Sequence, residues 1–262
     1  MPHYLRPRPG RVLGAGSMAW SAVIALVALG AVEAITRLGV VSRFSLLPIS
    51  TMVTRAARLL TEGPFLTGTF LPSIGLIASS FAISVVLGVA LAYGLWRSPW
   101  WHRAVQPYLN VYYSVPTFAL YPVFVVVFGQ GALPILLISV AFAMVVVVSS
   151  ALNGFGAVPG VVTKLSLSAR LSRRQHFTKV LLPAALPDIA IGVRLALVYS
   201  IISVLATQFI LSTSGLGHYI AYAYNNFQIE DMYGGITIVC LIALVSNVLI
   251  SRVLRRFDWR EK

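Results

Sequence analysis

Residues 171–192 read LSRRQHFTKVLLPAALPDIAIG, a basic stretch in a chain of which 58% of the residues are hydrophobic and only 10% are charged. A soluble domain normally carries roughly 25% charged residues. The mean hydropathy of +0.86 therefore predicts that lipid surrounds most of this chain. The stretch is a polar interruption within a membrane protein, and apolar sequence resumes directly after it.

Six apolar stretches are long enough to cross a bilayer, whose hydrocarbon core of about 30 Å requires roughly 20 helical residues. They lie at about 14–36, 69–95, 105–128, 132–152, 188–212 and 233–254. The sequence thus predicts an all-α membrane protein with six transmembrane helices in a single transmembrane domain, 1–262. We expect the first stretch to be a membrane anchor; a cleaved signal peptide is the alternative, disfavoured by the length and the poor cleavage site.

Cations are distributed unequally between the two sides that six spans define. Four lie in segments on the far side from the N-terminus: Arg37, Arg43, Arg55 and Arg58. Fifteen lie on the side of the N-terminus: Arg6, Arg8, Arg11, Arg97, Arg103, Lys164, Arg170, Arg173, Arg174, Lys179, Arg252, Arg255, Arg256, Arg260 and Lys262. Cytoplasmic loops of membrane proteins carry the excess of Lys and Arg, so both termini are expected in the cytoplasm.

The net charge of +13 does not indicate a nucleic-acid-binding protein, because the cations lie in short segments between apolar runs. The single cysteine, Cys240, excludes an internal disulfide framework and leaves no Cys/His cluster for a metal. We therefore expect no cofactor and no metal in this chain, and the lipid membrane rather than nucleic acid as its surroundings.

Two connecting segments are long. The external one, 37–68, has an amphipathic pattern that predicts a helix on the outer membrane surface. Its apolar face holds Met52, Val53, Ala56, Leu59 and Leu60, and its polar face holds Arg55, Arg58 and Glu62. The chain would then comprise an anchor and external segment (1–63), a core (64–254) and a cytoplasmic tail (255–262).

The other long segment is the cytoplasmic loop 153–183. Its pattern predicts two short helices separated by a basic turn, with Pro159 before the first and Pro183 after the second, since proline marks helix ends. Alternatively, its cations only anchor the loop to anionic lipid headgroups.

Several segments resemble one known family. They are SRRQHFTKVLLPAALPDIAIGVRLAL (172–197), SVPTFALYPVFVVVFGQG (114–131), SGLGHYI (214–220) and FQIEDMYGGI (227–236). In this order they resemble the membrane subunits of type I binding-protein-dependent ABC importers, in particular the nitrate, sulfonate and taurine branch. The resemblance covers about 64–260 and implies the type I ABC importer permease fold.

The resemblance implies that the loop 153–183 docks in a groove of an ATP-hydrolysing subunit. The implied coupling residues are Lys164, Leu165, Ser166, Arg170, Ser172, Arg173, Arg174, Phe177, Val180 and Pro183. The upstream half departs from the family: Lys164 stands where the family has Glu, and Arg170 where it has Gly, a residue that reaches turn conformations other residues do not adopt easily. Either the ATPase groove is acidic, or this chain is the degenerate half of a heterodimer.

Polar residues in the stretch 188–212 are candidates for a translocation path. Tyr199, Ser203 and Thr207 share one helix face, and Gln208, where the branch commonly has Glu, is adjacent. They either line the path or form hydrogen bonds between helices. Pro116 suggests an interruption in the span 105–128, where Tyr113 and Phe118 either contact substrate or are interfacial aromatics.

In helix 69–95, Ser80, Ser84, Gly88 and Ala92 recur every fourth residue, a pattern typical of close helix packing.

The expected function is a permease subunit in a bacterial inner membrane that imports a small organic or inorganic anion. The implied partners are ATP-binding cassette ATPase subunits, a second permease copy or paralogue, and a periplasmic or lipid-anchored binding protein. This chain has no GxxxxGK[ST] pattern, so ATP would be bound by the partner subunits. The rivals are an ion-coupled secondary transporter, which normally needs acids near mid-membrane, and a serine protease using Ser214 and His218.

Overall fold

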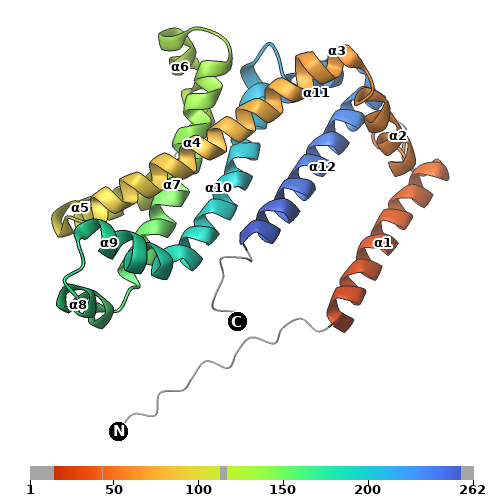
Figure 1. The fold of residues 1–262 in the computed structure, drawn as a ribbon. Helices are drawn as coiled ribbons and strands as arrows, with labels where there is room; N and C mark the ends of the chain where they lie inside the picture. The colour runs from red at the N-terminus through yellow and green to blue at the C-terminus, as the bar shows by residue number, and fades with distance from the viewer. Residues whose placement is uncertain (1–14, 43, 113–116, 255–262) are drawn as a thin grey trace.

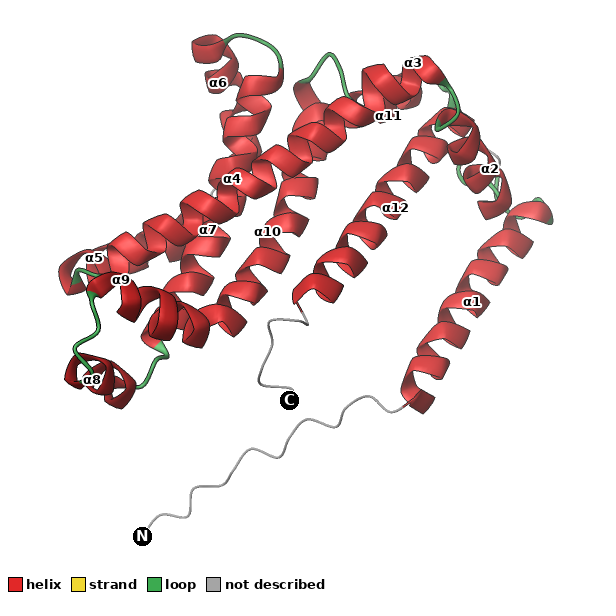
Figure 2. Cartoon of the chain, viewed as in Figure 1, coloured by secondary structure: helices red, strands yellow, loops and turns green. Residues whose placement is uncertain are grey.

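The computed structural model describes residues 15–42, 44–112 and 117–254, and their regular secondary structure is entirely helical (Figures 1 and 2). The helices are α1 (Ala15–Arg37), α2 (Ile49–Leu59), α3 (Gly63–Phe65), α4 (Leu71–Trp96), α5 (Pro99–Tyr112), α6 (Tyr121–Phe128), α7 (Ala132–Gly156), α8 (Gly160–Ser168), α9 (Arg173–His176), α10 (Leu182–Leu211), α11 (Leu216–Asn225) and α12 (Ile229–Leu254). Two π-helical turns, η1 (Leu66–Phe70) and η3 (Phe177–Leu181), and one 3-10 turn, η2 (Thr117–Leu120), connect some of them.

Four continuous helical segments are long and apolar enough to cross a membrane: Gly63–Trp96, Ala132–Gly156, Arg174–Leu211 and Ile229–Leu254. They confirm the helices predicted at 69–95, 132–152, 188–212 and 233–254. The first predicted stretch, 14–36, coincides with α1, which contacts α2 and otherwise stands apart at one side of the bundle (Figure 1).

The described residues of the stretch 105–128 fall into α5, η2 and α6, in agreement with the interruption suggested for this span. After α5 ends at Tyr112, η2 and the eight-residue α6 follow, with Pro122 in the first turn of α6. α6 ends at Gly129, whose φ of 78° lies in the left-handed region that glycine reaches without a Cβ clash. Prolines and glycines therefore divide this stretch into short helices.

Pro183 does not end a helix, contrary to the prediction. The chain from α9 through η3 into α10 forms one helical segment that includes Pro183 and Pro187. A proline removes one backbone hydrogen bond and crowds the preceding turn. The π-turn η3 lies directly before Pro183, and η1 lies in the same way before Pro72, so a locally widened turn precedes each proline and the helix continues.

The centre of the bundle is formed by α4, α7 and α10, which pack against one another. The stripe predicted for helix packing is confirmed, since Ser80, Ser84, Gly88 and Ala92 are all buried. A Cβ atom on Gly88 would lie 2.7 Å from the Cβ of Val147, and one on Gly192 would lie 2.5 Å from the Cβ of Ser150. Glycine thus allows α7 to approach α4 on one side and α10 on the other.

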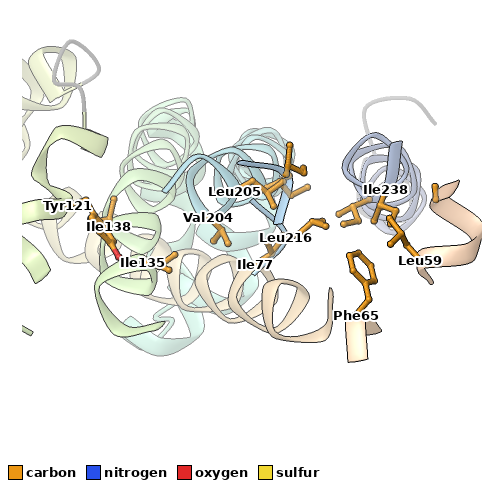
Figure 3. Packing of buried hydrophobic residues seen from close by; sticks show 14 residues of the cluster. Leu59, Phe65, Ile77, Tyr121, Ile135, Ile138, Val204, Leu205, Leu216 and Ile238 are labelled. Atoms are coloured by element: carbon orange, nitrogen blue, oxygen red, sulfur yellow. The ribbon is translucent and has the colours of Figure 1, made fainter. Parts of the chain in front are cut away.

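An apolar cluster fills the end of the bundle next to α11. It joins residues of α2, α4, α6, α7, α10, α11 and α12. Figure 3 shows Leu59 and Phe65 near Ile238 of α12. A second cluster fills the opposite end, where Phe155, Leu181 and Ala185 pack with residues of α4. The two clusters fix both ends of the α4–α7–α10 unit.

The predicted amphipathic helix is present as α2, and its apolar residues Ala56 and Leu59 are buried against the rest of the chain. Its polar face is not simply solvated, because the Arg55 guanidinium lies 2.5 Å from the Asp231 carboxylate of α12 and 2.7 Å from that of Glu62. The hydrogen bond to Asp231 raises the pKa of Arg55 further above its ordinary value. Gly234 lets α2 approach, since a Cβ there would lie 2.9 Å from Arg55 Cγ.

We expect Gly192→Ala to lower the melting temperature of the purified protein, because the new methyl group overpacks the α7–α10 contact at a cost of about 1–3 kcal/mol. The matched control is Gly94→Ala, where the added Cβ meets nothing within 4 Å. That control should leave the melting temperature unchanged or raise it, since alanine favours a helix over glycine. Equal effects of the two substitutions would contradict the packing role of Gly192.

Candidate functional site

The turn between α8 and α9 has a left-handed residue at its centre. Arg170 has a φ of 52°, and the Leu171 amide donates a hydrogen bond to the Ser166 carbonyl at 3.2 Å. This six-to-one bond is the Schellman arrangement that closes a helix C-terminus. Arg170 does adopt the conformation that the sequence analysis reserved for glycine, and for an L-residue that conformation costs about 1–2 kcal/mol.

Ser172 begins the second helix of this unit. Its Oγ accepts a hydrogen bond from the Gln175 amide at 3.3 Å, and its own amide donates to Gln175 Oε1 at 2.9 Å. These reciprocal bonds form a capping box. The Ser-x-x-Gln spacing was readable in the sequence and would have placed the start of α9.

A side-chain contact joins the two helices across the turn. The Oγ of buried Ser166 and the Nδ1 of His176 are 2.7 Å apart, within hydrogen-bond distance. The Schellman turn, the capping box and this contact hold α8 and α9 together as one compact unit, which we call the α8–α9 unit (160–176).

Phe177 connects the α8–α9 unit to the membrane helices. Its ring centroid lies 4.2 Å from that of Tyr93 on α4 and 6.3 Å from that of Phe155 on α7. Val180 and Pro183 are half-buried nearby. The predicted downstream coupling residues therefore attach the loop to the bundle.

The α8 helix presents apolar side chains away from the bundle. Val161 is 76% exposed and Leu165 is 69% exposed, and α8 lies at the extremity of the molecule in Figure 1. Ser172 and Arg174 are also exposed. Lys164 is on α8 and Arg173 begins α9, but their side chains lie outside the described part of the structure.

The predicted path residues lie on α10 at different depths. Ser203, Thr207 and Gln208 are buried, whereas Tyr199 is half-buried with its ring edge-on to Phe142, 5.0 Å between centroids. The Ser203 hydroxyl has no hydrogen-bond partner in the described part of the chain, and neither does that of Ser200. Tyr113 lies outside the described residues. Phe118 belongs to η2, which contacts α10, and its side chain is not described.

Gln208 is the centre of a buried polar contact. Its Oε1 accepts hydrogen bonds from the Ser73 hydroxyl at 3.0 Å and the Gly217 amide at 3.2 Å, and Ser73 Oγ accepts one from the Leu216 amide at 2.8 Å. A Cβ on Gly215, whose φ is 94°, would lie 2.3 Å from Gln208 Nε2. The SGLG segment thus fits over Gln208. Ser73 was not predicted, since nothing in the sequence relates it to a residue 135 positions away.

Among the described residues, no group of three or more His, Cys, Asp or Glu side chains is placed to hold a metal ion.

Comparison with known proteins places this helical arrangement in a family. A sequence model described as "Binding-protein-dependent transport system inner membrane component" matches residues 84–262. The chain belongs to this family. It is an ABC transporter permease and a multi-pass membrane protein.

Individual relatives agree with this assignment. The permease is 30% identical over 233 residues to a putative aliphatic sulfonates transport permease of Bacillus subtilis, covering 87% of this chain and 83% of that protein. It is 28% identical to the taurine transport permease TauC of Escherichia coli, covering 66% and 63% of the two chains. It matches 62% of the length of a probable ABC transporter permease of Haemophilus influenzae, with 29% identity.

The fold resembles a solved one. The inward-facing MetNI methionine ABC transporter superimposes with a TM-score of 0.62 at 18% identity, over 75% of this chain and 99% of that chain. The type I ABC importer permease arrangement expected from the sequence is therefore similar to that of MetNI.

We expect Arg170→Gly to stabilise the α8–α9 unit by about 1 kcal/mol, because glycine adopts the left-handed conformation without the Cβ clash. Hydrogen exchange of residues 160–176, followed by mass spectrometry, should slow. The matched control, Arg174→Gly in right-handed α9, should speed exchange, since glycine disfavours a helix interior. Faster exchange in both variants would contradict the strain assigned to Arg170.

We expect Gln208→Ala to destabilise the protein by about 1–3 kcal/mol, because the Ser73 hydroxyl and the Gly217 amide lose a buried acceptor. Thr207→Val is the control, since among the described residues its hydroxyl bonds to the Ser203 carbonyl of the same helix alone. The measurement is thermal unfolding in detergent. An unchanged melting temperature with altered uptake would instead favour a path role for Gln208.

Proposed function

We propose that this permease is one of two membrane-spanning halves of an ABC importer in the bacterial cytoplasmic membrane. In this assembly it pairs with a second copy or a paralogue, and the two together enclose the translocation path. Two ATP-binding cassette ATPases bind and hydrolyse ATP on the cytoplasmic side. A periplasmic or lipid-anchored binding protein delivers the substrate to the outer side.

One observation carries this proposal: the helix that contains η3 and α10 is too long for the membrane alone. The segment Arg174–Leu211 has 38 residues, a length of about 57 Å at 1.5 Å per residue. The hydrocarbon core is about 30 Å thick. The excess length lies outside the core, and the exposed, polar end at Arg174 is the end that we place in water.

The projecting end bears the features of a docking element. Exposed Val161 and Leu165 give α8 an apolar surface that water does not favour, and cations surround it. Phe177 fixes the same unit to α4 and α7. A soluble ATPase that binds α8 would therefore move helices of the membrane bundle, which is the mechanical requirement for coupling.

The orientation rests on charge. Fifteen cations fall on the side of the N-terminus and four on the other, so the α8–α9 unit and both termini belong in the cytoplasm. The α2–α12 contact and α11 then face the outside. In this topology α1 and the stretch 105–128 complete six spans, the latter as a broken helix.

The substrate class follows from the relatives and the chemistry of α10. Three relatives are named as permeases for aliphatic sulfonates, taurine and nitrate. These names favour a small organic or inorganic anion as the substrate. The buried hydroxyls of Ser200 and Ser203 are hydrogen-bond donors without a partner in the described residues. Such groups can bind an anion in a conformation that opens α10 to the path, with Tyr199 and Thr207 beside them.

We expect Leu165→Asp to abolish co-purification of the ATPase and substrate uptake, because a charge replaces an exposed apolar side chain of the docking surface. Leu38→Asp is the matched control, since Leu38 is similarly exposed at 77% but lies beside α1 on the outer side. The measurement is recovery of the ATPase on an affinity-tagged permease expressed with its neighbouring genes. Retention of the ATPase by Leu165→Asp, at normal permease yield, would contradict the docking role of α8.

A further inference from the structure

A groove between α10 and α12 combines an apolar wall with one arginine. It has a volume of about 200 Å³ and is lined by Arg194, Asn247, Leu197, Val198, Ile201, Ile202, Ala243 and Ile250. α12 lies beside α10 on the side away from α4 and α7 (Figure 1). We call this cavity the α10–α12 groove.

The Arg194 guanidinium has unused binding capacity. Its Nε donates to Asn247 Oδ1 at 3.1 Å, and this is its one polar partner in the described part of the chain. A guanidinium has five N–H donors. Asp188 is also on α10, but it faces α7, because a Cβ added at Gly154 of α7 would lie 3.0 Å from the Cβ of Asp188. Asn247 therefore orients a cation that has no counter-charge among the residues that the structure describes.

The shape of the groove matches a lipid chain. From Arg194 to Ile202 the groove follows α10 for eight residues, or about 12 Å. One leaflet of the hydrocarbon core is about 15 Å deep. The cation lies at the end nearer the α8–α9 unit, and the apolar wall extends from it towards the outer end of the bundle. A headgroup at Arg194 would place an acyl chain along Val198 and Ile202.

We propose that the α10–α12 groove binds an anionic phospholipid of the cytoplasmic leaflet, with its phosphate on Arg194 and one acyl chain in the groove. This assignment rests on the proposed orientation of the permease. A second copy of α1 is the other apolar object that could cover the groove, but the one acid of α1, Glu33, is already paired with Arg37 and hydrogen-bonded to Ser50. Charge complementarity therefore favours the lipid.

The bound lipid would contact two helices with different attachments. α10 is continuous with the α8–α9 unit, whereas α12 is joined to α2 and α11 at the outer end. A lipid between them would stabilise the conformation in which the Arg194–Asn247 contact is made.

The test is native mass spectrometry of the full-length permease titrated with phosphatidylglycerol or phosphatidylcholine of identical acyl chains. The wild type should bind phosphatidylglycerol about fivefold more tightly, from roughly 1 kcal/mol per arginine near an anionic headgroup. Arg194→Gln should remove this preference, and Arg194→Lys should keep most of it. Val198→Trp should weaken binding of both lipids by filling the groove.

Two controls separate this site from general charge and from unfolding. Arg58→Gln removes an exposed cation of α2 on the other side of the membrane and should leave the lipid preference intact, as should Val253→Trp outside the groove. Melting temperatures of the variants should match that of the wild type; if Arg194→Gln unfolds, Arg194→Lys and Val198→Trp carry the comparison.

Three results would overturn the proposal: an unchanged preference in folded Arg194→Gln, an equal loss in Arg58→Gln, or a disulfide between Val198→Cys of one copy and Ile24→Cys of another with no lipid preference. Recovery of the ATPase on the tagged permease tests the importer assignment separately. Loss of the lipid preference with the ATPase retained would overturn only the lipid site, whereas a permease without an ATPase would overturn the proposed function.

Discussion

The contact between α7 and α10 is the constraint on which the rest of the structure depends. Gly192 permits it, because any side chain there would occupy the position of Ser150. With that face of α10 fixed against α7, Arg194, two residues later, points towards α12. The same helix carries Gln208 near its C-terminal end and is continuous with the α8–α9 unit at its N-terminal end. Within the Gly-x-Arg pattern, Gly192 thus contacts α7 and Arg194 contacts α12.

Polar contacts at the α11 end of the bundle add to the apolar packing in the same place. Gln208 and Ser73 hold the segment before α11, and Arg55 holds α2 to Asp231 of α12. Each contact joins residues more than a hundred positions apart. Both lie near the ends of the long helices, where an ionised side chain such as Arg55 is closer to water than at the centre of a membrane span.

The sequence predicted the features that depend on composition and local pattern. Hydropathy located four long helices, and the small residues from Ser80 to Ala92 located the packing face of α4. The predictions failed where tertiary packing overrules a local rule. Pro183 was expected to end a helix, yet a π-turn precedes it and the buried side chains of Leu181 and Ala185 favour continuity. Arg170 was expected to avoid a left-handed turn. However, the Leu171 amide closes this turn on the Ser166 carbonyl, and Ser172 caps the helix that follows. Ser73 has no local signal of its contact with Gln208. The predicted roles of the coupling and path residues stay predictions.

The helix from Arg174 to Leu211 also carries two prolines, Pro183 and Pro187, inside one continuous segment. Each proline removes a backbone hydrogen bond of the helix, so the segment bends more easily here than elsewhere along its length. Leu181 and Ala185, on either side of Pro183, are fully buried against α4 and α7. Side-chain packing rather than backbone hydrogen bonding therefore fixes the direction in which the α8–α9 unit leaves the bundle.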